Sequence, residues 1–265
     1  MANIAVASLN VEILHLFFLF LRKEKRQSHN SAIALMNCLK TILHAPVNNG
    51  TLKKNPFHGY KLTQKPVFRN FLELDEIKML QKAHLLNSQE ELKRDVFLFA
   101  CFTGMSYADI KGLRGNHIFS DPDGTLFIRN VRQKTGIQSI IPLLPLAQEI
   151  LIKYSTTCQC RDFRWQIMSN QKLNSCIKEI AKRVGILKPI YMHLGRHTFA
   201  TTVTLTHGVP LETVSKMLGH STIKHTQIYA KIVASKVKSD MSKIAHIFSE
   251  SNDLTTIAEF EMSSK

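Results

Sequence analysis

The sequence predicts a mainly α-helical protein with one small antiparallel β-sheet, an α+β fold. Apolar residues recur at helical spacing over most of the chain, but the period changes to alternation between Ile118 and Leu143. Two turn signals lie inside that stretch, Asp-Pro-Asp-Gly at 121–124 and Lys-Thr-Gly at 134–136. With 265 residues, of which 44% are hydrophobic, the chain can bury a sizeable core, which excludes a disordered protein and a short disulfide scaffold.

The first part of the chain predicts two helices followed by an irregular segment. Helical spacing covers residues 11–26 and 29–45. We interpret the irregular, basic segment 50–70 as a linker, because an acidic and helical composition resumes near Phe71. The predicted domains are a partial helical domain with its linker over residues 1–65 and a larger domain over residues 66–265.

In the larger domain, a capping box at Ser88 and Glu91 predicts the start of a helix. This helix extends to Phe102 and is apolar nearly all round, so it is expected at the centre of the core. Gly104 ends it, and a short helix from Asp109 to Leu113 follows. The turn signals predict a hairpin, and helical spacing resumes after it. The expected strands are Leu126–Arg132 and Gln138–Ile141, and the expected later helices are 144–154, 170–184, 193–206, 211–218 and 231–249.

The chain is strongly basic, with 35 Lys and Arg against 20 Asp and Glu and a formal charge of +15. This balance favours a polyanionic partner, with nucleic acid first and a membrane surface second. The excess is concentrated between residues 20 and 70, where Glu24 is the single acid. A solvated face is the alternative explanation of such a charge run. Four lysines of this region are candidate DNA contacts: Lys53, Lys54, Lys61 and Lys65.

The cysteines and the longest apolar run indicate where the protein acts. Five cysteines form an odd set, and only Cys158 and Cys160 are closely spaced, which favours a reducing compartment without a disulfide framework. The apolar run from Val11 to Leu21 is about half of the ~20 residues that a membrane span needs. We expect a buried helix there, no secretory signal, no membrane association and a cytoplasmic location.

The most informative residues lie between positions 193 and 229. The first motif is the run His193-Leu194-Gly195-Arg196-His197-Thr198-Phe199-Ala200-Thr201. The second is Leu218-Gly219-His220, and Tyr229 follows nine residues after its histidine. Together these motifs resemble the tyrosine recombinase, or phage integrase, family. The likeness extends upstream to Phe102-Thr103-Gly104 and Gln133-Lys134-Thr135-Gly136, so it covers most of residues 70–245.

The resemblance implies a reaction and a role for each matching side chain. A tyrosine oxygen attacks a DNA phosphodiester, forms a 3′-phosphotyrosyl bond and expels a 5′-hydroxyl, without a metal or other cofactor. Tyr229 matches the nucleophile and Arg196 the arginine that clamps the scissile phosphate. His220 is expected to donate to a non-bridging oxygen, and His193 to help take the tyrosine proton. Lys134 matches the lysine that protonates the leaving oxygen.

The sequence departs from the family pattern at one arginine. Members commonly read Thr-Gly-Leu-Arg, whereas this chain has Ser106 at the arginine position. Serine can hydrogen-bond a phosphate but lacks the charge, and Ser106 with Asp109 also has the form of a helix cap, which we favour. Arg132 is the hypothesised replacement, since residues two apart in a strand share a face and Arg132 should project beside Lys134. Arg129 should point to the other side, and an ordinary surface arginine is the alternative for Arg132.

Three other interpretations use the same residues. His193 and His197 have the helical spacing of a zinc hydrolase, but Leu194 replaces the required glutamate, so we interpret His197 as a packing or orienting residue. Residues 208–229 also resemble a helix-turn-helix, with Thr213, Ser215 and Lys216 on the second helix, and Lys216 is a further candidate DNA contact. If these residues form a helix-turn-helix that only binds DNA, the protein is a regulator or a non-catalytic, DNA-binding remnant.

The two ends of the chain bear on assembly. The first helices resemble only the later helices of the family's core-binding domain, so we expect an N-terminally shortened integrase of a mobile element. In the family the C-terminal end packs on a neighbouring protomer, and we expect an apolar stripe here either to do the same or to dock on the core of its own chain. We expect double-stranded DNA as the partner, with a homo-oligomer, a tetramer, assembled on it and accessory DNA-bending proteins. The stripe comprises Leu254, Ile257 and Phe260.

Overall fold

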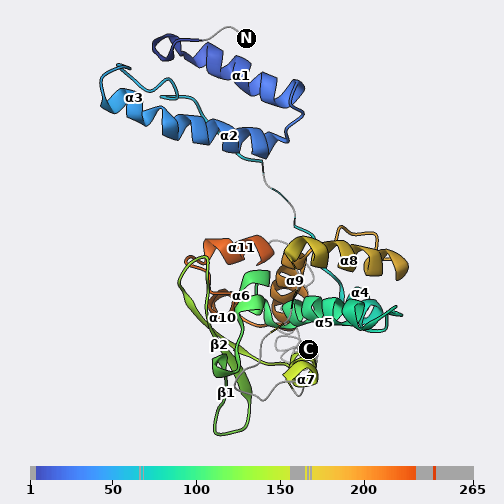
Figure 1. The fold of residues 1–265 in the computed structure, drawn as a ribbon. Coiled ribbons are helices and arrows are strands. Elements are labelled where there is room, and N and C mark those ends of the chain that lie inside the picture. Colours follow the sequence, from blue (N-terminus) through green and yellow to red (C-terminus); the bar gives the residue numbers. More distant parts are fainter. Residues whose placement is uncertain are drawn as a thin grey trace, which may run out of the picture. The chain divides into compact units, whose positions relative to one another are not determined.

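The computed structural model describes residues 4–65, 67, 69–155, 165, 167, 169–230 and 241–242. The chain divides into two compact units, Met1–Phe68 and Arg69–Lys265, whereas the predicted boundary lies between residues 65 and 66. The elements of the described residues are mostly helices, with one antiparallel sheet, which confirms the predicted fold class (Figure 1).

Among its described residues, the first unit has three α-helices, preceded by a 3₁₀ turn at Val6–Ser8, around its own apolar core. Helices α1 and α2 begin at side-chain caps, where Asn10 Oδ1 accepts from the Ile13 amide at 2.9 Å and Ser28 Oγ accepts from the Ser31 amide at 3.2 Å. The helix predicted over 29–45 is divided, because α2 ends at Ile42 and a short α3 follows. The helices are α1 (Val11–Lys23), α2 (His29–Ile42) and α3 (His44–Asn48). The core comprises Leu14, Leu21, Ala32, Met36, Leu43, Leu52 and Phe57.

The interpretation of residues 50–70 as a linker is wrong as far as Lys65. Leu52 and Phe57 are buried in the core of the first unit. Asn30 also holds the backbone of Lys65 on both sides: its Nδ2 donates to the Lys65 carbonyl at 2.8 Å, and its Oδ1 accepts from the Lys65 amide at 2.9 Å. The chain therefore stays attached to this unit as far as Lys65.

In the second unit α5 lies at the centre of a helical core, as its apolar sequence predicted (Figure 1). Every residue from Val96 to Cys101 is buried, and α7, α8 and α9 pack against α5. Gly195 lets α9 approach closely, because a Cβ there would lie 3.1 Å from Ala100 Cβ and 3.3 Å from the Cys101 amide nitrogen. The helices are α4 (Leu74–Gln81), α5 (Ser88–Thr103), α6 (Tyr107–Gly112), α7 (Pro145–Ser155), α8 (Asn170–Arg183), α9 (Met192–Thr198), α10 (Leu211–Met217) and α11 (Lys224–Ala230).

The start of α5 is capped one residue earlier than predicted. Asn87 Oδ1 accepts from the Glu90 amide at 2.9 Å, and the Glu90 carboxylate accepts from the Leu86 amide at 3.1 Å. The predicted pair, Ser88 and Glu91, lies inside the helix instead. Asparagine is as good an N-cap as serine, so the local sequence offers two overlapping caps and the earlier one is used.

The sheet has the strand order β1-β2-β3, and both pairings are antiparallel. Ile128 is the central buried residue, paired with Ile118 on one side and Ile141 on the other. The three-residue β1 is too short to give a periodic signal and was not predicted. Strand β2 also ends one residue early, so Arg132 begins the turn and its carbonyl accepts from the Gly136 amide at 2.8 Å. The strands are β1 (Ile118–Ser120), β2 (Leu126–Val131) and β3 (Gln138–Pro142).

The helix predicted over 193–206 changes its winding after Thr198. It continues as a π-helical segment, η3 (Phe199–Thr204), and a 3₁₀ turn, η4 (Leu205–His207). Thr204 Oγ1 lies 3.0 Å from the Phe199 carbonyl oxygen and 2.8 Å from that of Ala200, so a hydroxyl group competes for the helical carbonyls.

Several predicted features lie outside the described residues. They are Cys158, Cys160, the apolar stripe of the tail and the helix over 231–249 except for residues 241–242. Helix α11, which carries Tyr229, was not predicted from the sequence.

Candidate active site

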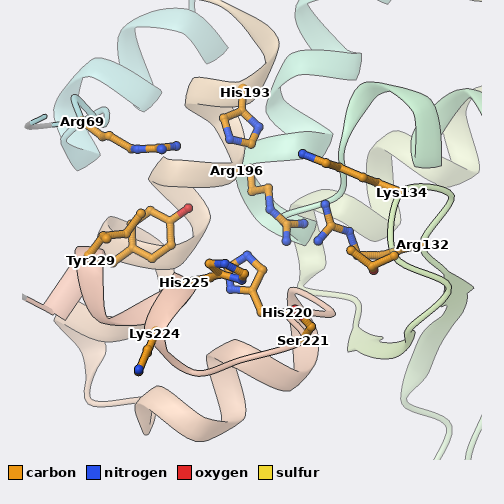
Figure 2. Close-up of a pocket in the computed structure, with 12 residues that line it drawn as sticks. Arg69, Arg132, Lys134, His193, Arg196, His220, Ser221, Lys224, His225 and Tyr229 are labelled. Atoms are coloured by element: carbon orange, nitrogen blue, oxygen red, sulfur yellow. The ribbon is translucent and has the colours of Figure 1, made fainter. Parts of the chain in front are cut away.

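A cavity of about 330 Å³ in the second unit gathers side chains from four separate parts of the chain (Figure 2). All six predicted catalytic candidates line it. Helix α9 contributes two of them, the β2–β3 turn contributes two, and the segment from the end of α10 through α11 contributes two. The lining among the described residues is Arg69, Arg132, Lys134, Thr135, His193, Arg196, His220, Ser221, Lys224, His225, Ile228 and Tyr229.

Arg196 is held by two backbone carbonyls. Its side chain is buried, Nη1 donates to the Gly104 carbonyl at 2.7 Å, and Nη2 donates to the Leu218 carbonyl. Gly104 adopts a left-handed conformation with φ 68°, which turns the chain out of α5. Burial and the neighbouring Arg132 lower the pKa of Arg196 to about 10, so the guanidinium stays charged at neutral pH.

The guanidinium group of Arg132 lies beside that of Arg196 in the cavity (Figure 2). Its Nη1 donates to the Gly219 carbonyl at 3.2 Å, and its Nε lies 3.9 Å from Asp109 Oδ2. The side chain is 11% exposed and packs on Gly219, where a Cβ would lie 2.7 Å from Arg132 Cδ. The structure thus brings Arg132 and Lys134 to one cavity as predicted, although Arg132 projects from the turn rather than from the strand. Arg129 is exposed and lies over the Phe119 ring instead.

Ser106 caps α6 and is not among the residues that line the cavity. Its Oγ accepts from the Asp109 amide at 3.3 Å and donates to Asp109 Oδ2 at 2.7 Å. The buried Asp109 in turn accepts from the Gln133 amide at 3.2 Å and faces Arg132. Ser106 therefore acts on the cavity through Asp109, which orients the hairpin that carries Arg132.

The other candidate DNA contacts are exposed lysines away from the cavity lining. Lys216 lies on the exposed face of α10, while the neighbouring Ser215 is buried. The remaining four lie in the first unit, and their side chains are exposed: Lys53, Lys54, Lys61 and Lys65.

The hydroxyl of Tyr229 has a partner that the resemblance does not assign. Tyr229 is buried, and its Oη lies 2.9 Å from Nδ1 of the buried His197. His193, which was expected to take the tyrosine proton, packs edge-on against the His197 ring with 4.5 Å between ring centroids. His220 Nδ1 lies 2.7 Å from Thr226 Oγ1, so α11 orients this second cavity histidine.

Three histidines at the site have lowered pKa values. Burial is the largest cause for each, followed by neighbouring positive charge: the pKa is about 4 for His193, about 3 for His197 and about 3 for His220. All three are therefore neutral at pH 7. Burial raises the pKa of Tyr229, and Arg196 opposes this rise, so the phenol is protonated at the same pH.

These shifts predict acid destabilisation. An unfolded histidine titrates near pH 6.5, so below that pH the unfolded chain binds protons that the folded chain does not, and the free energy of unfolding falls until the folded pKa is reached. We expect the chain to lose stability from pH 6.5 towards pH 4. Urea unfolding at several pH values measures this, and His197→Asn should reduce the slope. An unchanged slope in that variant would contradict the assignment of His197 as buried and neutral.

Sequence reasoning assigned no role to Thr226, which supports the cavity, or to six of the described residues that line it: Arg69, Thr135, Ser221, Lys224, His225 and Ile228. Arg69 precedes α4 and reaches the cavity near Tyr229 (Figure 2). Lys224 and His225 lie at the start of α11, and Thr226 holds His220. The segment Lys224–Thr226 contains no recognisable motif. The only sign of its role in the sequence is its position between the matched residues His220 and Tyr229.

A zinc site at His193 and His197 would need at least one further ligand. In the ranges that the structure describes, no three His, Cys, Asp or Glu side chains form a group that could hold a metal ion. The imidazole of His197 is instead engaged with Tyr229. Among the described helices, none has both the length and the apolar character needed to cross a bilayer.

Comparisons with known proteins show the family to which each part of the chain is similar. The model of the phage integrase family matches residues 70–236, and that of the phage integrase SAM-like domain matches residues 1–63. Tyrosine recombinase XerD of Listeria innocua is 27% identical over 245 residues, 87% of this chain and 80% of the relative. Tyrosine recombinase XerC of Thermodesulfovibrio yellowstonii is 24% identical over 249 residues, 87% and 78% of the two chains.

Solved structures share the fold. A lambda integrase dimer bound to a core site aligns with a TM-score of 0.69 at 17% identity, over 86% of this chain and 82% of that chain. The integrase of the transposon Tn1549, in complex with a circular intermediate DNA, aligns with a TM-score of 0.70 at 15% identity, over 91% and 88%. The family model covers more than half of the chain and includes every residue of the cavity lining except Arg69. The chain therefore belongs to the phage integrase family and is a tyrosine recombinase.

Proposed function

We propose that this protein is a site-specific DNA recombinase of a mobile element that breaks and reseals DNA through a 3′-phosphotyrosyl intermediate. One observation carries the proposal. A buried tyrosine hydroxyl and a set of cationic and imidazole groups, drawn from distant parts of the sequence, share one cavity. Such fixed donors stabilise the charge that develops on a phosphoryl group, and covalent capture conserves the bond energy for rejoining.

Each group has a proposed task. Arg196 and Arg132 hold the non-bridging oxygens of the scissile phosphate, and Lys134 protonates the leaving 5′-oxygen. When His220 Nδ1 accepts from Thr226, its Nε2 carries the proton and can donate to the phosphate. His193, neutral and on the cavity wall, completes the polar surface around the phosphate. The reaction requires no cofactor.

The proposed partners are double-stranded DNA and further copies of the chain. Solved relatives include a lambda integrase tetramer bound to a Holliday junction, which supports a homotetramer assembled on DNA. Accessory DNA-bending proteins and a cytoplasmic location complete the proposal. The exposed lysines are proposed to contact the DNA backbone, where each lost contact weakens binding and reduces its salt dependence: Lys53, Lys54, Lys61, Lys65 and Lys216.

The proposed function is tested with a nicked duplex from the border of the element that encodes the chain. The nick lets the short cleaved strand diffuse away, so a covalent protein–DNA adduct accumulates. We expect the wild-type protein to form this adduct in the presence of a chelator and Tyr229→Phe to form none. Absence of a wild-type adduct on a proven binding site would favour a DNA-binding remnant, and chelator sensitivity would favour a metal-dependent hydrolase.

Arg132 is tested against a matched arginine on the same strand pair. Arg132→Ala removes a guanidinium from the cavity and is expected to slow adduct formation about 100-fold. Arg129→Ala removes an exposed guanidinium and should change the rate by less than about threefold. Equal rates in the two variants would show that Arg132 serves the packing against Gly219 and not the phosphate.

A further inference from the structure

The buried imidazole of His197 contacts the reacting atom of the proposed nucleophile. Its Nδ1 lies 2.9 Å from Tyr229 Oη, the distance of a good hydrogen bond. His197 and Tyr229 are 1% and 2% exposed, so water does not compete for this contact. His197 does not line the cavity, whereas Tyr229 does. The imidazole thus approaches the phenol from the protein side and leaves its cavity side to the phosphate.

We propose that His197 is a catalytic residue that accepts the Tyr229 proton during attack. This inference rests on the proposed function and assigns the proton to a different histidine from the family's pattern. The Tyr229 O–H proton moves to His197 Nδ1, the phenolic oxygen forms a bond to phosphorus, and the bond from phosphorus to the 5′-oxygen breaks. The leaving oxygen takes its proton from Lys134. In the resealing step the same protons return by the reverse path.

The surrounding charges make this base sensitive to the substrate. His197 has a lowered pKa first because it is buried and then because positive groups lie around it, so without DNA the phenol keeps its proton. A bound phosphodiester neutralises Arg196, and the proton affinity of His197 then rises. The charged and titratable groups around the imidazole, from every element packed against it, are His193 and Arg196 on α9, Arg69 before α4, His220 after α10 and Tyr229 on α11.

His197→Asn separates proton acceptance from positioning. The asparagine amide places a polar atom near the position of Nδ1, so it can still hydrogen-bond Tyr229 but cannot take a proton. We expect this variant to bind the nicked duplex as the wild type does and to form the covalent adduct at least about 100-fold more slowly. In the absence of a base, its rate should rise with pH as hydroxide deprotonates the phenol.

A sulfur-substituted substrate distinguishes protonation of the leaving oxygen from removal of the Tyr229 proton. With sulfur in place of the bridging 5′-oxygen, the leaving group departs without protonation. We therefore expect this duplex to restore Lys134→Ala to near wild-type rates and to leave His197→Asn slow. His207→Asn is the matched control, because His207 is exposed and does not line the cavity, so its rate should stay within about threefold of the wild type.

The outcomes separate the inference from the proposed function. A wild-type protein that forms no adduct overturns both. A wild-type adduct together with full activity of His197→Asn overturns the inference alone, as does restoration of His197→Asn by the sulfur substrate. Thermal unfolding and binding of the duplex verify the fold of each variant. Should His197→Asn fail to fold, His197→Gln is measured in the same assays, and a wild-type rate in it again contradicts the inference.

Discussion

Arg196→Lys is expected to slow formation of the covalent adduct by about 100-fold to 1,000-fold while DNA binding is retained. The guanidinium donates to the Gly104 and Leu218 carbonyls and still presents further N–H groups to the cavity. A lysine ammonium is a point charge with three donors and cannot hold both carbonyls and a phosphate in one plane. Single-turnover cleavage of the nicked duplex measures the effect.

Arg183→Lys is the control for this substitution. Arg183 lies on α8, pairs with Glu90 at 2.6 Å and does not line the cavity. Its replacement should leave the rate within about threefold of the wild type. If Arg196→Lys cleaved as fast as Arg183→Lys, Arg196 would serve the fold and not the phosphate.

Gly104→Ala is expected to have the largest effect on stability, a loss of roughly 2–5 kcal/mol. Gly104 has φ 68°, a left-handed conformation that disfavours side chains. A Cβ there would also lie 2.5 Å from Phe199 Cδ1 and 2.8 Å from Leu218 Cδ2, both in the core. Equilibrium urea unfolding measures the loss. Adduct formation should fall as well, because the Gly104 carbonyl holds Arg196.

Gly124→Ala isolates the backbone contribution to that loss. Gly124 has φ 80°, but a Cβ there meets no atom within 4 Å. Its replacement therefore carries only the left-handed strain, about 1–2 kcal/mol. The same loss in both variants would show that the core around Phe199 relaxes freely and that the close contact at Gly104 has no energetic consequence.

The central helix and the residues that meet in the cavity could be predicted because they depend on local patterns. The apolar residues of α5 are buried as their spacing indicated. The motif spacing likewise selected five of the candidates that share the cavity, and the alternation of side chains beside Lys134 added the sixth, Arg132. The predicted position of the α5 cap was wrong by one residue, because the adjacent side chains of Asn87 and Ser88 are equivalent helix caps.

Other features depend on tertiary contacts that local patterns do not encode. The segment after residue 50 is basic and irregular, and this composition predicted a linker. Its two apolar residues, Leu52 and Phe57, are nevertheless buried in the core of the first unit. The partner of Tyr229 could not be foreseen, because it depends on how α11 packs on α9. Arg69 belongs to no recognisable motif. It reaches the cavity because it is the first residue of the second unit, at the point where the chain enters that unit.

The most direct measurement identifies the amino acid and the DNA end that are joined in the trapped adduct. Protease digestion and mass spectrometry of the adduct should yield one modified peptide, with the 3′-phosphate of the cleaved strand on the oxygen of residue Tyr229. A linkage through the 5′ end, or through another hydroxyl such as that of Ser221 in the same cavity, would contradict the account.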